Sequence, residues 1–394
     1  MRHKRPVYIE IPRDVVGQSC EAPGPLERIP RGSDPAALGE AIGEANAMIR
    51  AARRPVILAG VEIHRFGLQE ALVNLVDSSR LPFATTLLGK SVIGERHPGY
   101  LGVYEGAMGL EKVRRAVETA DCVLILGAFM TDINLGIYTA QLEPAKTINA
   151  TSERISISHH HFDEIDLREF IVGLTDRLAD SRRNHVTVQH QEPRAFRPHP
   201  NRPITVNRFF ARMNEFLDEH KVVICDIGDS LFGAADLQIH RRTEFLSPAY
   251  YTSMGFAVPA AIGAQINRRT HRPVVFVGDG AFQMTGHELS TIAKLGLNPI
   301  VFVLNNKGYT TERFISEGPY NDIQDWAFHE WPRIVRAGWG CEVRTEGELE
   351  AALREAESNT DSYSIVNVHL EKLDRSRALD RLARRLAKRA GRPK

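Results

Sequence analysis

Two short motifs in the second half of the sequence could bring a carboxylate and an amide together. The apolar run 274–277 ends in Gly278-Asp279-Gly280, and a second apolar run, 300–304, ends in Asn305-Asn306-Lys307-Gly308. The runs are predicted to be strands, with a helix over 281–295 between them. In a right-handed βαβ unit the two strands are parallel, so both turns lie at the same edge of the sheet. Asp279 and Asn306 are therefore expected to meet in space.

These motifs together suit a magnesium ion that carries a diphosphate. One carboxylate, one amide oxygen and one loop carbonyl are hard ligands, and Mg²⁺ keeps its other positions for water and phosphate oxygens. The glycines permit close backbone approach, and a helix that begins near Ala281 offers free N–H groups to an anion. Each motif alone could instead be a tight turn after a strand. Their combination at this spacing favours the metal-bridged diphosphate.

The residues around these motifs predict an α/β domain over 204–373. A helix is expected at 206–219, and strands are expected at 222–225, 274–277, 300–304 and 364–369. Residues 35–178 show the same alternation, with helices expected at 36–51 and 111–119, an amphipathic segment at 68–79, and strands at 55–59, 82–86, 122–126, 146–149 and 154–158. Short apolar strands between helices favour parallel sheets with right-handed crossovers. The expected fold class is α/β with two doubly wound parallel-sheet domains. The first lacks a GxGxxG phosphate loop.

Polar or irregular segments separate these domains. Residues 17–34 and 179–203 are rich in Pro, Gly, Ser and charge, which predicts linkers. The opening residues 1–16 contain a short apolar run that is typical of a buried strand. The basic tail 374–394 carries Leu379, Leu382, Leu386 and Ala390 at helical spacing, which predicts an amphipathic helix. Such a helix either packs through its leucines or binds nucleic acid or a membrane.

Composition narrows the function classes. The 394 residues include 50 Lys and Arg against 49 Asp and Glu, a net charge of +1, so no global field attracts a polyanion. We therefore expect a small-molecule ligand rather than nucleic acid or a membrane. The sequence begins without a signal peptide, which predicts a cytoplasmic protein. The four cysteines are widely spaced, with no CxxC pair, which predicts reduced thiols; Cys122 and Cys225 lie in apolar runs and are expected in the core.

The paired motifs resemble the thiamine-diphosphate and magnesium motif of thiamine-dependent enzymes. The stretches that are similar to the pyruvate and indolepyruvate decarboxylase branch are RPVYIEIPRD at 5–14, GKSVIGERHPGYLGVYEG at 89–106, GDSLFGA at 228–234, SMGFAVPAAIGA at 253–264 and LNNKGYTTE at 304–312. The resemblance implies a central domain followed by a diphosphate-binding domain. It also implies thiamine diphosphate and Mg²⁺ as cofactors. The reaction would be non-oxidative decarboxylation of a 2-oxo acid, of the pyruvate, indolepyruvate or phenylpyruvate type, to an aldehyde and carbon dioxide.

The resemblance also assigns individual residues. The metal ligands would be Asp279, Asn306 and the carbonyl of Gly308. The cofactor contacts would be Gly228, Asp229, Ser230, Thr252, Ser253, Met254, Asp279, Gly280, Ala281, Asn306, Gly308, Tyr309, Thr310 and Thr311. Met254 would hold the two cofactor rings in a bent shape, although core packing is the alternative. Asp229 stands where many relatives have threonine, and a turn-forming aspartate is an almost equal interpretation.

Glu312 matches the family's second catalytic carboxylate, beside the substrate. That role requires an acid whose pKa is raised by partial burial and anionic neighbours. The alternative is a solvated glutamate near a helix start.

A further domain is implied but is not found in the printed sequence. Full-length relatives begin with a pyrimidine-binding domain that carries a catalytic glutamate and paired histidines, and residues 1–16 resemble only its closing strand. The resemblance therefore implies a homo-oligomer, or a partner chain that supplies this domain. One alternative is a catalytically incompetent module that still binds thiamine diphosphate. A second, weaker alternative is an acetolactate-synthase-like carboligase.

Overall fold

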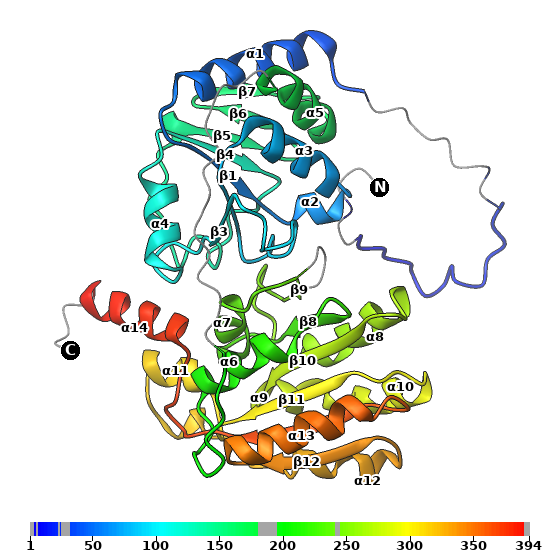
Figure 1. Cartoon of the computed structure of the whole chain (residues 1–394). Coiled ribbons are helices and arrows are strands. Elements are labelled where there is room, and N and C mark those ends of the chain that lie inside the picture. The colour runs from blue at the N-terminus through cyan, green and yellow to red at the C-terminus, as the bar shows by residue number, and fades with distance from the viewer. Residues whose placement is uncertain are drawn as a thin grey trace.

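The computed structural model describes residues 4, 7–22, 24, 32–179, 195–240 and 245–389. Figure 1 shows two layered α/β domains, one built from a seven-stranded sheet and one from a six-stranded sheet. The strand orders are β3-β2-β1-β4-β5-β6-β7 and β12-β13-β11-β10-β8-β9. Strands are mostly parallel and helices cover both faces, so the predicted fold class is confirmed.

The central domain follows the predicted alternation closely. Its strands are β1 Pro55–Ala59, β2 Phe83–Thr85, β3 Tyr100–Val103, β4 Cys122–Leu126, β5 Thr147–Ala150, β6 Ile155–Ile157 and β7 His160–Phe162. Its helices are α1 Pro35–Ala51, α2 Glu62–Arg65, α3 Gln69–Ser79, α4 Glu111–Glu118 and α5 Leu167–Leu178. Side chains alternate across β1 and β4, so α1, α3 and α5 pack on one face of the sheet and α4 on the other.

One part of the parallel-sheet prediction is wrong in this domain. β5 and β6 pair antiparallel, and so do β6 and β7, which makes the edge of the sheet a meander. The links between these strands contain only a few residues. A parallel connection needs a crossover of a dozen residues or more, whereas short links of this kind form hairpins.

The C-terminal domain contains six parallel strands. They are β8 Lys221–Cys225, β9 Phe245–Leu246, β10 Arg272–Gly278, β11 Ile300–Asn305, β12 Trp339–Val343 and β13 Ser364–His369. The helices are α6 Val206–Phe216, α7 Asp229–Ala235, α8 Ala257–Asn267, α9 Asp279–Thr285, α10 Leu289–Lys294, α11 Thr310–Ile315, α12 Trp331–Val335, α13 Glu346–Ser358 and α14 Arg377–Arg389. The helix predicted over 281–295 is divided into α9 and α10 by a 3₁₀ turn at Gly286–Glu288.

The register of β10 and β11 decides where the two chemical motifs lie. Val274 pairs with Ile300 and Gly278 pairs with Leu304, so the strands end together. Their last residues lead directly into Asp279 and Asn306, at the carboxyl edge of the sheet. This edge is where open α/β sheets bind their ligands.

The opening segment is not the buried strand that its apolar run predicts. Residues 7–11 form no strand, and the exposed fractions of Val7 and Ile9 are 81% and 74%. Figure 1 shows this segment as part of a loop beside the central domain. No strand in the described residues pairs with it, and an extended chain without a partner strand buries little apolar surface.

The structure describes only part of the two predicted linkers and of the C-terminal tail. Residues 23, 25–31 and 180–194, in the two predicted linkers, lie outside the described residues. In the tail, α14 buries Leu379 and Leu382 against Met108 and Phe232, as the leucine spacing predicts. The side chain of Leu386 and the whole of Ala390 lie outside the described part. Within that part, no helix is both long and apolar enough to cross a membrane. Cys122 and Cys225 are buried thiols, as predicted.

A buried ion pair joins the two domains. Lys90 Nζ lies 2.7 Å from Glu95 Oε1 and also donates to the carbonyl of Leu237, at 2.7 Å. Glu95 Oε2 accepts from the backbone N–H of Ile239 at 2.9 Å. Both side chains belong to the central domain, whereas their backbone partners follow α7. The pair therefore fixes the chain that leaves α7, a helix that forms one wall of the site described next.

Candidate active site

The loops after β10 and β11 meet through one aspartate. Asp279 Oδ1 accepts from the backbone N–H of Gly280 at 2.7 Å, and Oδ2 accepts from the N–H of Gly308 at 3.1 Å. The side chain is 2% exposed, and burial raises the pKa of Asp279 to about 6, although the backbone N–H groups oppose that shift. A buried carboxylate that joins two loops in this way can also bind a cation through its oxygen atoms.

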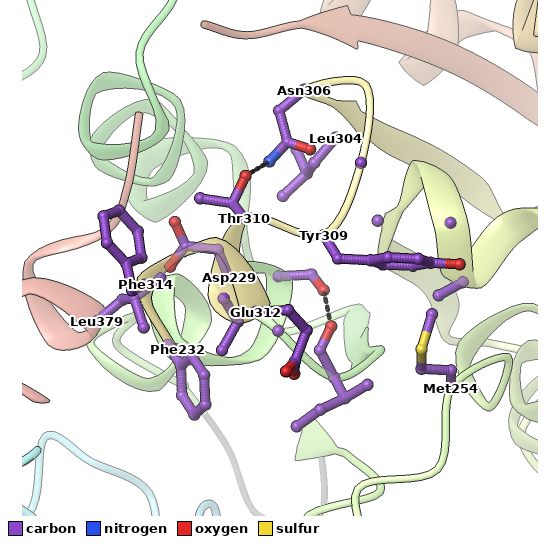
Figure 2. Close-up of a pocket in the computed structure, with 18 of the residues that line it drawn as sticks. Asp229, Phe232, Met254, Leu304, Asn306, Tyr309, Thr310, Glu312, Phe314 and Leu379 are labelled. Carbon is purple, nitrogen blue, oxygen red and sulfur yellow. Dashed lines mark hydrogen bonds between the residues drawn. The ribbon is translucent and has the colours of Figure 1, made fainter. Parts of the chain in front are cut away.

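Asn306 offers a second candidate ligand atom. Its Nδ2 donates to Thr310 Oγ at 2.7 Å, while its buried Oδ1 has no hydrogen-bond partner among the described residues. A buried amide oxygen without a partner is costly unless a ligand takes its lone pairs. Figure 2 shows the Asn306 side chain at the rim of the pocket, joined to Thr310.

Two glycines are required by close contacts. Gly308 has φ +148°, and a Cβ there would lie 2.0 Å from the carbonyl oxygen of Asn321. A Cβ on Gly280 would lie 2.3 Å from the Tyr309 ring. Neither position can accept a larger residue without moving its neighbours. The backbone therefore stays open where a diphosphate would approach.

A buried arginine braces the loop that contains Gly308. The guanidinium of Arg313 donates to the Asn321 carbonyl at 3.0 Å and pairs with Asp322 and with Glu317. Asp322 also pairs with Lys372 Nζ at 2.7 Å. Tyr309 N–H donates to the same Asn321 carbonyl at 2.9 Å. These contacts bind residues 307–309 to the chain at 321–322. The loop that follows β11 is therefore held from its outer side.

Another buried aspartate builds the opposite wall. Asp226, after β8, accepts from the N–H groups of Ile227 at 3.0 Å, Gly255 at 3.1 Å and Ala257 at 2.9 Å. Burial raises the pKa of Asp226, while these backbone donors partly offset the shift. One side chain thus positions both the turn that leads to Asp229 and the loop that carries Met254. Neither the motifs nor the resemblance pointed to Asp226.

Asp229 lies where the pocket meets the C-terminal segment. Its Oδ2 accepts from the N–H of Ser376 at 2.7 Å, and its buried Oδ1 has no hydrogen-bond partner in the described chain. Burial is the main cause that raises the pKa of Asp229 to about 6. The turn interpretation of Asp229, in which it bonds its own loop, is not what the structure shows, since its partner is Ser376.

These walls enclose one pocket with a volume of about 600 Å³. It is lined by almost all the residues that the sequence singled out: Gly228, Asp229, Ser230, Thr252, Met254, Asp279, Gly280, Ala281, Asn306, Gly308, Tyr309, Thr310, Thr311 and Glu312. Ser253 is the exception, because it is exposed and does not line the pocket. Figure 2 shows Met254 and the Tyr309 ring on the same side of the pocket, away from Phe232 and Leu379.

Glu312 differs from expectation in its environment. It lines the pocket, and Figure 2 places it with Phe232 to one side and Met254 to the other. The partial burial expected of the catalytic acid is not found, since Glu312 is exposed. The partial burial that the assignment requires would have to come from a group outside the described residues.

The pocket also contains apolar residues that sequence reasoning missed. They are Ile133, Ile137, Val206, Ile227, Phe232, Leu304, Phe314, Ile315, Leu370, Leu379, Leu382 and Ala383. Ile133 and Ile137 come from the central domain, and Leu379 and Leu382 come from α14, so segments far apart in the sequence supply this side. Only the leucine spacing of the tail gave a signal, and it indicated packing rather than a pocket.

The donor set fits a hard cation with an anion. Asp279 offers a carboxylate, Asn306 an unpartnered amide oxygen and Gly308 a backbone carbonyl, all of which are oxygen ligands. The N–H groups at the start of α9 and the open space at Gly278 adjoin them. No thiolate or imidazole from the described residues lines the pocket, so its oxygen donors would suit a hard cation such as Mg²⁺ or Ca²⁺ better than zinc.

Comparisons with known proteins show the family to which the chain belongs. Residues 42–173 match the family described as thiamine pyrophosphate enzyme, central domain, and residues 226–368 match its C-terminal TPP binding domain. The chain is 33% identical to an indole-3-pyruvate decarboxylase of Azospirillum brasilense over 375 residues. This alignment covers 92% of this chain and 66% of the relative. It is 32% identical to an alpha-keto-acid decarboxylase of Mycobacterium leprae, in an alignment that covers 97% of this chain and 68% of the relative. A probable pyruvate decarboxylase of Schizosaccharomyces pombe is 29% identical, with 95% and 67% covered. The chain thus spans about two thirds of the length of these relatives.

Proposed function

Because this chain belongs to the thiamine pyrophosphate enzyme family, among relatives named as 2-oxo-acid decarboxylases, we propose that it forms the cofactor-holding part of such a decarboxylase. The reaction would be non-oxidative loss of carbon dioxide from a 2-oxo acid of the pyruvate, indolepyruvate or phenylpyruvate type, giving an aldehyde. The observation that carries the proposal is the meeting of Asp279, Gly308 and the unpartnered Asn306 oxygen in one pocket.

The residues of the pocket would have separate roles in binding the cofactor and in the reaction. Asp279, Asn306 and the Gly308 carbonyl would bind Mg²⁺, and the N–H groups at the start of α9 would bind the diphosphate. Met254, held through Asp226, would support the cofactor rings from one side. When bound, thiamine diphosphate supplies the nucleophilic carbon and the electron sink for loss of carbon dioxide. Glu312 would hold or move a proton near the substrate carboxylate.

Further residues are needed beside Glu312. No histidine from the described residues lines the pocket, and Glu312 is exposed. We propose that a pyrimidine-binding domain, in a second copy or a partner chain, covers this side. Exposed apolar side chains at Tyr251 and Ile315, next to or within the pocket lining, support such an interface.

Calorimetric titration tests the cofactor site. Thiamine diphosphate should bind in the presence of Mg²⁺ and should not bind after chelation. Asp279→Ala should abolish this binding, whereas Asp77→Ala, which removes an exposed carboxylate of the central domain, should leave it unchanged. Magnesium-independent binding, or equal binding by Asp279→Ala, would contradict the proposed site.

A second assay tests the reaction. Carbon dioxide release should be measured from pyruvate, indolepyruvate and phenylpyruvate, for the chain alone and with a pyrimidine-binding domain from a relative. A non-catalytic binding module is the second candidate, and the exposure of Glu312 favours it for the isolated chain. Cofactor binding without turnover under any pairing would select that candidate. Joining of two substrate molecules in place of aldehyde release would instead indicate a carboligase.

A further inference from the structure

A hydrogen-bond chain connects the metal loop to the C-terminal segment. Thr310 Oγ donates to the backbone carbonyl of Lys372 at 3.0 Å and accepts from Asn306 Nδ2 at 2.7 Å. All three groups lie at the carboxyl edge of the sheet, and Figure 2 shows the Asn306 to Thr310 contact at the pocket rim. The Thr310 side chain therefore lies between a proposed metal ligand and a segment more than sixty residues further along the chain.

The direction of this chain follows from its last member. A backbone carbonyl can only accept, so the Thr310 hydroxyl proton is committed to Lys372. The Thr310 oxygen is then available only as an acceptor toward Asn306, and only the amide nitrogen can donate to it. The amide must therefore be oriented with its nitrogen toward Thr310 and its oxygen toward the pocket. Without the hydroxyl, nothing at this contact distinguishes one end of the amide from the other.

The carbonyl of Lys372 is itself held in place. Lys372 Nζ pairs with Asp322 at 2.7 Å, and Asp322 pairs with the buried Arg313. Four residues further on, Ser376 N–H donates to Asp229 at 2.7 Å, which ties the same segment to α7. The acceptor at the end of the hydrogen-bond chain is thus fixed by contacts on both sides.

We infer that Thr310 is a positioning residue that orients the Asn306 amide so that its oxygen, rather than its nitrogen, faces the metal. This inference rests on the proposed function and deepens it, because it assigns a side-chain role to Thr310 beyond contact with the cofactor. Outer-shell hydrogen bonds of this kind fix ligand orientation, and their loss typically costs about 10–100-fold in metal affinity. The Thr310 hydroxyl is the only part of the side chain that the role requires.

The test is a comparison of three variants by titration of Mn²⁺, a paramagnetic substitute for Mg²⁺, in the presence of thiamine diphosphate. Thr310→Val keeps the shape and removes the hydroxyl, and Thr310→Ala removes it with less risk of a clash. Thr310→Ser keeps the hydroxyl. We expect Thr310→Val and Thr310→Ala to weaken binding of the ion by about 10–100-fold. Thr310→Ser should bind within about threefold of the unmodified protein, a tolerance much smaller than that outer-shell loss.

The outcomes separate this inference from the proposed function. If the unmodified protein binds the ion and cofactor and all three variants bind equally well, the positioning role is overturned while the proposed function stands. If the unmodified protein binds neither, both are overturned. A loss shared equally by Thr310→Ser would also overturn the role, because general packing rather than the hydroxyl would then matter. Thermal unfolding of each metal-free variant shows whether the fold is intact, and Thr310→Ala carries the test if Thr310→Val does not fold.

Discussion

Asp226 Oδ1 accepts a hydrogen bond from the backbone N–H of Gly255 at 3.1 Å, across 29 residues of sequence. The same carboxylate accepts from Ile227 and Ala257, so a single buried side chain joins the turn after β8 to the loop that carries Met254. Gly255 has φ +83°, which suits glycine. Asp226 does not itself line the pocket, yet its hydrogen bonds hold together the pocket wall that faces the loop after β11.

Replacement of Asp226 by asparagine should loosen this wall. An asparagine NH₂ group would face an N–H donor, leaving at least one buried backbone donor unpaired. The expected loss is about 2–3 kcal/mol in the free energy of unfolding, measured by urea denaturation. Thiamine diphosphate affinity should fall as well, because the Met254 loop loses its anchor. Asp77→Asn, at a side chain that is 59% exposed, is the control and should change stability by less than about 0.5 kcal/mol. Equal stability of the two variants would show that Asp226 does not anchor the loop.

Gly308→Ala should abolish magnesium-dependent cofactor binding. The new Cβ would lie 2.0 Å from the Asn321 carbonyl oxygen, which the buried Arg313 holds in place, so the loop must move. Gly296→Ala is a matched control, since Gly296 also has a positive φ, +59°, but has no atom within 4 Å of the new Cβ. That control should cost only about 1 kcal/mol of backbone strain and should bind the cofactor normally. Calorimetry on both variants makes the comparison, and normal binding by Gly308→Ala would contradict the assigned loop geometry.

Glu105 should make stability depend on pH. It is 2% exposed, its Oε2 has no hydrogen-bond partner in the described chain, and burial with the nearby Asp236 raises its pKa to about 7. The charges of Arg381 and Lys90 oppose that shift. The folded state thus holds this proton more tightly than the unfolded state. The contribution of Glu105 to stability is fully present below about pH 4.5 and is lost as pH rises through about 7.

Glu105→Gln should remove this pH dependence, because the amide does not ionise. At pH 8 the variant should be more stable than the unmodified protein by roughly 3 kcal/mol, and at pH 5 the difference should fall below about 1 kcal/mol. Thermal unfolding at both pH values measures the change, and the comparison cancels the titration of other groups. Glu111→Gln, at an exposed glutamate of α4, should show no such dependence. A constant difference between the two pH values would rule out the titration of Glu105 as the cause.

Lys90→Met should weaken the contact between the two domains. Glu95 would remain buried with Tyr100 and the Ile239 N–H as partners, but without the cation that neutralises it. Breaking a buried pair in this way typically costs about 3–5 kcal/mol. The double variant Lys90→Met/Glu95→Gln should be less destabilised than Lys90→Met, because no buried charge is left over. The unfolding temperatures of the two variants test this expectation. If the double variant is less stable than Lys90→Met, the unpaired charge of Glu95 is not the cause of the destabilisation.

The sequence alone determined the fold class and most of the elements. Apolar runs were sufficient for β1, β4, β8, β10, β11 and β13, because each is buried on both faces over most of its length and reads as a largely apolar segment. The antiparallel edge β6–β7 was missed, because apolar alternation indicates a strand but not the direction of its neighbour. The run at residues 7–11 was misread for a related reason, since β propensity becomes a strand only where a partner strand is present.

The sequence also determined that the candidate ligand atoms of Asp279 and Asn306 lie together at the ends of β10 and β11, because the βαβ connection forces both loops to one edge of the sheet. Only the tertiary structure decided how those atoms are oriented and enclosed. Asp226, the Thr310 to Lys372 contact and the apolar side formed by Ile133, Ile137 and α14 depend on residues far apart in the chain, with no local motif to announce them. Local pattern reports what a residue can bind, whereas long-range packing decides which of its atoms remain free to do so.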